Sequence, residues 1–133
     1  MTKVFLIVNA EHQYDLSCFL ADNKFEIYNC LGNVEDILTQ LNNFLPDIIL
    51  IDSNFENAEF VTRQINQIAK QNNTQIILLL DNNTEVNYLD YVDGIVELPL
   101  KNNILLATIN SHLKNKVSLD RLYENNKELS RSL

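Results

Sequence analysis

Glycine is scarce in this chain, with two residues in 133, and tryptophan is absent. The two glycines, Gly32 and Gly94, lie too far apart to form a glycine-rich motif. Loops of that kind cradle nucleotide phosphates, and a glycine on each side of a serine marks the nucleophile of many hydrolases. The sequence therefore lacks the motifs of P-loop, dinucleotide-binding and α/β-hydrolase enzymes.

Basic residues are also few, with 10 Lys and Arg against 18 Asp and Glu and a formal net charge of −8. This balance opposes nucleic acid, anionic membranes and polyphosphates as partners. No apolar run approaches the ~18 residues of a membrane-spanning helix, and residues 1–3 lead into an expected strand without a signal peptide. We therefore expect a cytoplasmic protein that binds neither nucleic acid nor a membrane.

The two cysteines, Cys18 and Cys30, fit no metal-ligand spacing and have no accompanying Cys/His cluster. We expect both to be reduced, packed thiols, and we expect no resident metal. Asparagine, in contrast, is plentiful and recurs in pairs between the periodic segments. Because asparagine tolerates left-handed backbone and caps helices, we expect it to form many of the turns that glycine forms elsewhere.

The most hydrophobic stretch, residues 48–51 (Ile-Ile-Leu-Ile), follows Pro46 and ends at Asp52. A short apolar run rich in β-branched residues is typical of a strand buried on both faces of a parallel sheet. Ligands of open α/β sheets collect at the carboxyl ends of the strands, so Asp52 is a candidate site residue. A helix-capping or loop aspartate is the alternative.

Apolar runs and alternation predict five strands, and 3.6-residue periodicity predicts the helices between them. The expected strands cover residues 3–8, 25–30, 48–52, 76–80 and 94–97. The expected helices cover residues 12–21, 34–45, 58–68 with Asn57 as cap, 85–92 with Thr84 as cap, and 101 onward. Short loops between alternating strands and helices predict an α/β fold, a doubly wound, flavodoxin-like parallel sheet with strand order 2-1-3-4-5.

Several features of this layout coincide with one signalling family. They are the first strand with its polar end, Pro46-Asp47 ahead of Asp52, the apolar strand 76–80, Gly94 and Leu98-Pro99. Together they resemble the receiver domain of two-component response regulators over about residues 3–115. The resemblance implies a signal-transduction module of a phosphorelay, in which Asp52 matches the aspartate that accepts the phosphoryl group.

The remaining receiver positions have changed type. An acidic pair that binds Mg²⁺ in receivers corresponds here to Asn9 and Ala10, and a Thr or Ser that holds the phosphoryl oxygen corresponds to Leu80. The lysine before the last proline corresponds to Leu98, and the aromatic switch position corresponds to Ile95. The fourth helix region is also about four residues short. The chain thus resembles a degenerate receiver, or pseudo-receiver.

The expected site is an acidic pocket formed by Asn9, Glu11, Asp52 and Asp81. Mg²⁺ prefers near-octahedral oxygen ligands with one or two carboxylates, and Asn9 and Ala10 supply no carboxylate. We therefore expect no cofactor, with Mg²⁺ bound only if Asp52 is functional. The leading hypothesis is a non-enzymatic module that binds a protein partner, an attached output domain or a second copy of itself. The alternatives are a working phosphoacceptor and, on fold alone, a flavodoxin-like cofactor binder.

The last segment extends past the end of a receiver's fifth helix. We divide the chain into a receiver-like domain, residues 1–115, and a helical linker, residues 116–133, leading to an output domain of a longer protein. The leucines of the linker have a spacing that suits either a short coiled-coil seam with one polar position or an exposed linker. Tyr88 and Tyr91 either face a partner or pack beneath the fourth helix. The interface candidates are Tyr88, Tyr91, Leu119, Leu122, Asn126 and Leu129.

Overall fold

Five parallel strands form the centre of the protein in a computed structural model that describes residues 1–30 and 32–115. The strands are β1 (Lys3–Ile7), β2 (Glu26–Asn29), β3 (Ile48–Asp52), β4 (Gln75–Asp81) and β5 (Gly94–Leu98). Their order is β2-β1-β3-β4-β5, and all neighbouring pairs are parallel. This order confirms the predicted doubly wound sheet.

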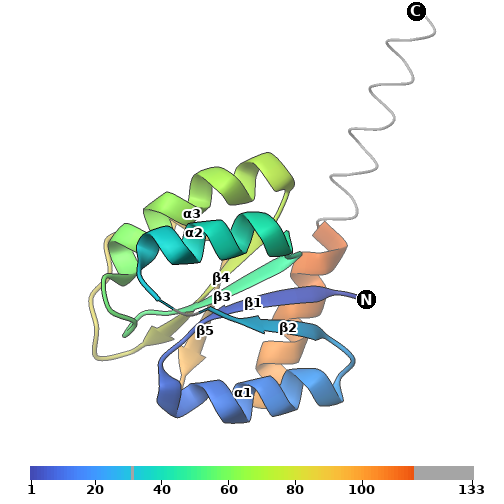
Figure 1. The fold of residues 1–133 in the computed structure, drawn as a ribbon. Coiled ribbons are helices and arrows are strands. Elements are labelled where there is room, and N and C mark those ends of the chain that lie inside the picture. Colours follow the sequence, from blue (N-terminus) through green and yellow to red (C-terminus); the bar gives the residue numbers. More distant parts are fainter. Residues whose placement is uncertain (31, 116–133) are drawn as a thin grey trace, which may run out of the picture.

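Helices cover both faces of the sheet (Figure 1). They are α1 (Ala10–Asp22), α2 (Val34–Phe44), α3 (Ala58–Asn72) and a C-terminal helix whose described part is 102–115. Alternate strand residues pack into two separate cores, because successive side chains of a strand point to opposite faces. One core lies under α2 and α3, and the other lies under α1 and the C-terminal helix.

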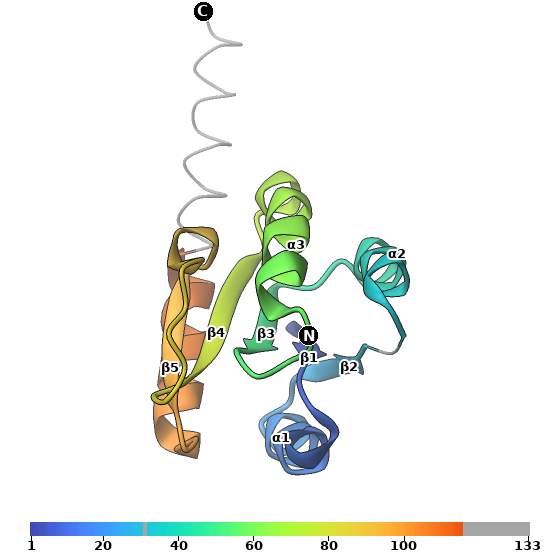
Figure 2. The ribbon, with the colours of Figure 1, turned by 90° about the vertical axis from the view of Figure 1, so that its left-hand side faces the viewer.

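The predicted helix over residues 85–92 is wrong, and a single 3-10 turn, η1 (Leu89–Tyr91), stands in its place. Tertiary contacts hold the rest of the segment as an irregular loop beside β4 and β5 (Figure 2). Asn66 Nδ2 donates to the carbonyl of Tyr91 at 3.0 Å, and Asp93 Oδ2 accepts from the N–H of Ile76 at 2.7 Å. These bonds outweigh the helix-like start of Thr84-Glu85, a local signal that tertiary context routinely overrides.

Tyr88 of that segment packs beneath it rather than facing a partner. Its side chain is 4% exposed and belongs to the core under α2 and α3. Burial raises the pKa of Tyr88, and the carboxylates of Glu59 and Asp52 raise it further. Tyr91 is half-buried, with the Arg63 guanidinium 5.4 Å from its ring centroid. Tyr88 is therefore corrected from an interface candidate to a core residue.

Asparagine takes left-handed backbone at both ends of α3. Asn57 has φ 59° and Asn73 has φ 53°, so these positions use the tolerance of asparagine for this region. Asn57 precedes the helix as predicted, but its side chain makes no capping hydrogen bond, and its carbonyl accepts from the N–H of Val61. At the start of α2, in contrast, Asn33 and Asp36 form a reciprocal capping box.

The four interface candidates Leu119, Leu122, Asn126 and Leu129 lie outside the described residues, as does the predicted linker. The division at residue 115 therefore stays a prediction. Within residues 1–30 and 32–115, no helix is both long and apolar enough to cross a membrane.

Candidate functional site

Asp52 ends β3 at the carboxyl edge of the sheet, where the sequence placed it. The residue is fully buried, at 0% exposure. Its Oδ1 accepts the N–H of Asn54 at 2.9 Å, the geometry of an aspartate that turns the chain after a strand. Its Oδ2 is buried and has no hydrogen-bond partner among the residues that the structure describes. One carboxylate oxygen is thus used by the loop, and the other is unsatisfied.

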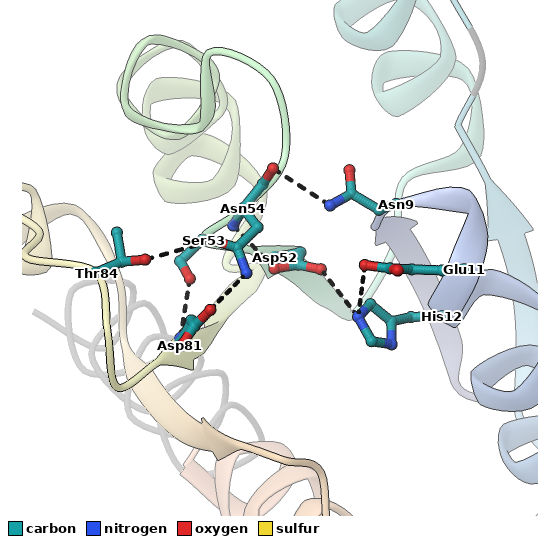
Figure 3. Close-up of polar contacts among 8 residues, drawn as sticks. All are labelled: Asn9, Glu11, His12, Asp52, Ser53, Asn54, Asp81 and Thr84. Atoms are coloured by element: carbon teal, nitrogen blue, oxygen red, sulfur yellow. Dashed lines mark hydrogen bonds and ion pairs between the residues drawn. The ribbon is translucent and has the colours of Figure 1, made fainter.

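The imidazole of His12 lies near that oxygen. Its Nε2 lies 4.0 Å from Asp52 Oδ2, too far for a hydrogen bond, and 3.3 Å from Glu11 Oε1. Figure 3 shows one imidazole nitrogen directed toward both carboxylates. The His12 side chain is 46% exposed, and the sequence did not indicate that it lies near Asp52. The signal that identifies it is its place in the first turn of α1, because β1 and β3 are neighbours in the sheet.

Asn54 joins three loops at this edge of the sheet (Figure 3). Its carbonyl accepts from Asn9 Nδ2 at 3.2 Å, and its own Nδ2 donates to Asp81 Oδ2 at 3.0 Å. Its Oδ1 accepts from the Thr84 hydroxyl at 3.4 Å. Nothing in the sequence indicates this role of Asn54, because its partners come from distant parts of the chain.

The four residues of the predicted acidic pocket do not converge on one point. Asp81 accepts hydrogen bonds from the N–H of Asn83 at 3.0 Å and from Asn54 Nδ2, and the Glu11 side chain is 72% exposed. Asn9 uses its amide to reach the neighbouring loop. The described part of the chain contains no group of three or more His, Cys, Asp and Glu residues that could hold a metal ion.

We expect Asn54→Ala to raise the pKa of Asp81. The N–H of Asn83 and then the Asn54 side chain hold the pKa of this carboxyl below its usual range, since both stabilise its charged form. The stability that Asp81 contributes is therefore present at neutral pH and is lost as the pH falls through its lowered pKa. Titration of the Asp81 carboxyl carbon by NMR measures both effects, and an unchanged pKa in Asn54→Ala contradicts this assignment.

Of the positions that the resemblance marked as changed, Leu80 and Leu98 lie at the carboxyl ends of β4 and β5, and Ile95 lies near the start of β5. Ala10 is the first residue of α1 and is exposed, and Ile95 is 41% exposed on β5. Leu80 is half-buried against the core under α2 and α3, whereas Leu98 packs against the core on the opposite face. No side chain at these positions carries a positive charge or a carboxylate.

A cavity of about 440 Å³ lies beside Asp52, between α1 and the start of the C-terminal helix. We call it the Asp52 cavity. Its lining is His12, Asp15, Leu16, Asp52, Leu79, Leu98, Pro99, Leu100 and Asn102. The lining within the described residues contains no lysine and no arginine, and leucine and proline side chains form most of its wall.

The cysteines and the second histidine take no part in this site. Burial raises the pKa of Cys30 to about 11, which keeps its thiol protonated at neutral pH. Cys18 is exposed, so the prediction of a packed thiol is wrong for this residue. His112 is half-buried, with its Nδ1 3.2 Å from Gln75 Oε1. A side chain at Gly94 would collide with the imidazole of His112. His112 is therefore a packing residue.

Solved structures with similar folds include many receiver domains. A response regulator receiver modulated diguanylate cyclase from Pelobacter carbinolicus is 21% identical, with a TM-score of 0.74 over 91% of this chain and 99% of that chain. A response regulator receiver domain protein from Clostridium thermocellum is 15% identical, with a TM-score of 0.76 over 90% and 99%. NtrX from Brucella abortus is 14% identical, with a TM-score of 0.79 over 98% of this chain.

The chain spans 30% of the length of NtrX. Neither a protein-family model nor a curated protein sequence matches this chain. The likeness to solved structures therefore concerns the fold. The chain has the flavodoxin-like fold of response-regulator receiver domains, as the sequence predicted.

Proposed function

We propose that this chain is a receiver-like signalling module that does not use phosphorylation of Asp52. It acts through contact with a protein partner, an attached output domain or a second copy of itself. The receiver fold supports a role in signal transduction, and solved neighbours include a receiver that modulates a diguanylate cyclase. The module itself carries out no catalysis in this proposal.

The observation that carries the proposal is the environment of Asp52. Phosphoryl transfer depends on positioned metal ions and cations that neutralise the developing charge. Here the basic side chain that faces Asp52 is His12, whose Nε2 lies 4.0 Å from Oδ2. Leu98 occupies the place of a receiver's lysine, and Ala10 brings no metal ligand. Oδ1 of Asp52 is hydrogen-bonded to the loop and Oδ2 is buried behind His12, so neither oxygen faces an incoming phosphoryl donor in this conformation.

A working phosphoacceptor is the second candidate, and one observation favours it. Asp52 stands at the carboxyl end of β3 with Oδ2 unpartnered within the described residues, so this oxygen is not committed to another group. Movement of His12 and entry of Mg²⁺ would then be needed to expose and activate it.

Beryllium fluoride with Mg²⁺ mimics the phosphorylated aspartate and separates the two candidates. We expect the backbone amide NMR spectrum of the full chain to show no saturable change on addition of this reagent. The Asp52→Asn variant gives the background response of the reagent itself. Saturable shifts around Asp52 that disappear in Asp52→Asn would establish the phosphoacceptor instead.

A further inference from the structure

The Asp52 cavity combines an apolar wall with one buried, unsatisfied carboxylate oxygen. Its volume of about 440 Å³ lies in the range of sites for small organic molecules, about 300–1,000 Å³. Such sites pair a largely apolar lining with a few polar groups that fix the orientation of the ligand. Leu16, Leu79, Leu98 and Leu100 supply the lining here.

The polar group that selects a ligand is Asp52. Its side chain is 0% exposed, lines the cavity, and leaves Oδ2 without a hydrogen-bond partner in the described residues. Buried carboxylates are normally paired or strongly hydrogen-bonded, because an isolated buried charge is costly. The oxygen therefore favours a charged donor over a neutral one. The other acidic group of the lining, Asp15, is exposed at the rim.

From this combination we propose that the Asp52 cavity binds a small organic cation, a primary ammonium group carried on a compact apolar body. The ammonium would donate to Asp52 Oδ2, and the apolar body would lie against the leucines. Asp15 and Asn102 line the same cavity and offer oxygen acceptors for the remaining N–H groups. The formal net charge of −8 raises the local concentration of cations around the chain.

An organic cation fits this cavity better than a metal ion. Mg²⁺ and Ca²⁺ need six or more oxygen ligands, bound waters included, and of the two acidic lining residues Asp52 is buried whereas Asp15 is exposed. In the described residues no group of three or more metal-ligating side chains exists. An ammonium ion, in contrast, needs only a few acceptors and tolerates an apolar surface around its carbon body.

His12 controls access to the carboxylate. Its imidazole lies against Oδ2 at 4.0 Å, and its side chain is 46% exposed. Oδ2 itself is buried from solvent. The imidazole must therefore turn toward solvent before a ligand donor reaches Oδ2, and an exposed histidine can make that rotation on the picosecond to nanosecond scale.

Benzylammonium chloride and benzyl alcohol test the proposal, because they share an apolar body and differ in charge. Each is titrated into the full chain at constant ionic strength, and backbone amide shifts are followed by NMR. We expect benzylammonium to give saturable shifts around Asp52, Leu79 and Leu98, with a Kd at least tenfold lower than that of benzyl alcohol. Equal affinities for the amine and the alcohol would overturn the proposal.

Three variants locate the contact. Asp52→Asn should weaken benzylammonium at least tenfold and leave benzyl alcohol within about twofold. Asp81→Asn makes the same substitution at the same sheet edge but outside the cavity, and should change neither affinity. Leu98→Lys places the ammonium group of a lysine side chain in the cavity, where it should compete with the ligand and abolish benzylammonium binding. The amide NMR spectrum of this variant should remain that of a folded protein.

Two results contradict the inference. Unchanged benzylammonium affinity in Asp52→Asn would show that the carboxylate does not hold the amine. Saturable, Asp52-dependent shifts with MgCl₂ and none with benzylammonium would show that the site takes a metal ion. The benzylammonium titration tests the cavity alone, and the beryllium fluoride experiment tests the proposed function. Either proposal can therefore fail without the other.

Discussion

The substitution Asp52→Asn should raise the free energy of unfolding by about 1 kcal/mol or more, because it replaces a buried, unpaired carboxylate oxygen by a neutral amide whose own burial costs about 1–3 kcal/mol. The wild-type carboxylate keeps one oxygen in the hydrogen bond from the N–H of Asn54 and leaves Oδ2 buried without a partner in the described chain. An asparagine retains the oxygen that accepts from Asn54 and replaces the charged oxygen by a neutral amide. Because a buried neutral group costs less than a buried charge, the variant gains stability.

Urea unfolding at neutral pH measures this gain, and thermal unfolding should show a rise in Tm of about 3–5 °C per kcal/mol for a domain of this size. Asp81→Asn is the matched control. Its carboxylate is exposed to solvent and accepts from Asn83 and Asn54, so removing the charge should lower stability or leave it unchanged. A loss of more than about 1 kcal/mol in Asp52→Asn would mean that a donor or cation satisfies Oδ2 in solution.

The strands were predictable from the sequence because their chemistry is local. Apolar runs such as residues 48–51 and 76–80 are typical of strands in the middle of a sheet covered on both faces, and both runs form such strands here. The right-handed crossover rule then sets the strand order, and Asp52 follows from the end of β3. These parts of the structure required no knowledge of distant contacts.

The parts that the sequence did not predict depend on contacts between distant segments. The helix expected at residues 85–92 is absent because Asn66 and Asp93 hold this segment through backbone groups. His12 lies near Asp52 because α1 begins beside the end of β3. Helix periodicity along the chain does not show which strand a helix begins beside. The network around Asn54 has the same origin, since its partners lie 27 to 45 residues away.

The second large effect is expected on the rate of Asp52 phosphorylation when four positions are given the residue types that receivers have there. The combined variant Asn9→Asp, Ala10→Asp, Leu80→Thr and Leu98→Lys should increase the rate of Asp52 phosphorylation by acetyl phosphate and Mg²⁺ by about 100-fold or more. Two charge contacts of about 1.5 kcal/mol each, one through the metal and one through the lysine, account for a factor of that size. The acidic pair supplies the carboxylates that Mg²⁺ prefers.

The initial rate of phosphoryl incorporation, measured by intact mass, checks this expectation. The same four substitutions combined with Asp52→Asn are the control, because they keep the new charges and remove the acceptor. The amide NMR spectrum shows whether the combined variant is folded. A folded variant that binds Mg²⁺ and reacts no faster than the wild type would mean that these positions are not what limits phosphorylation.

The wild-type chain provides the most direct test of a receiver fold without a working phosphoacceptor. Its intact mass is measured over time with Mg²⁺ and excess acetyl phosphate, beside Asp52→Asn under the same conditions. We predict that the two proteins gain phosphoryl groups to the same negligible extent. A stable gain of one phosphoryl group in the wild type that is absent from Asp52→Asn would contradict the account and identify Asp52 as a phosphoacceptor.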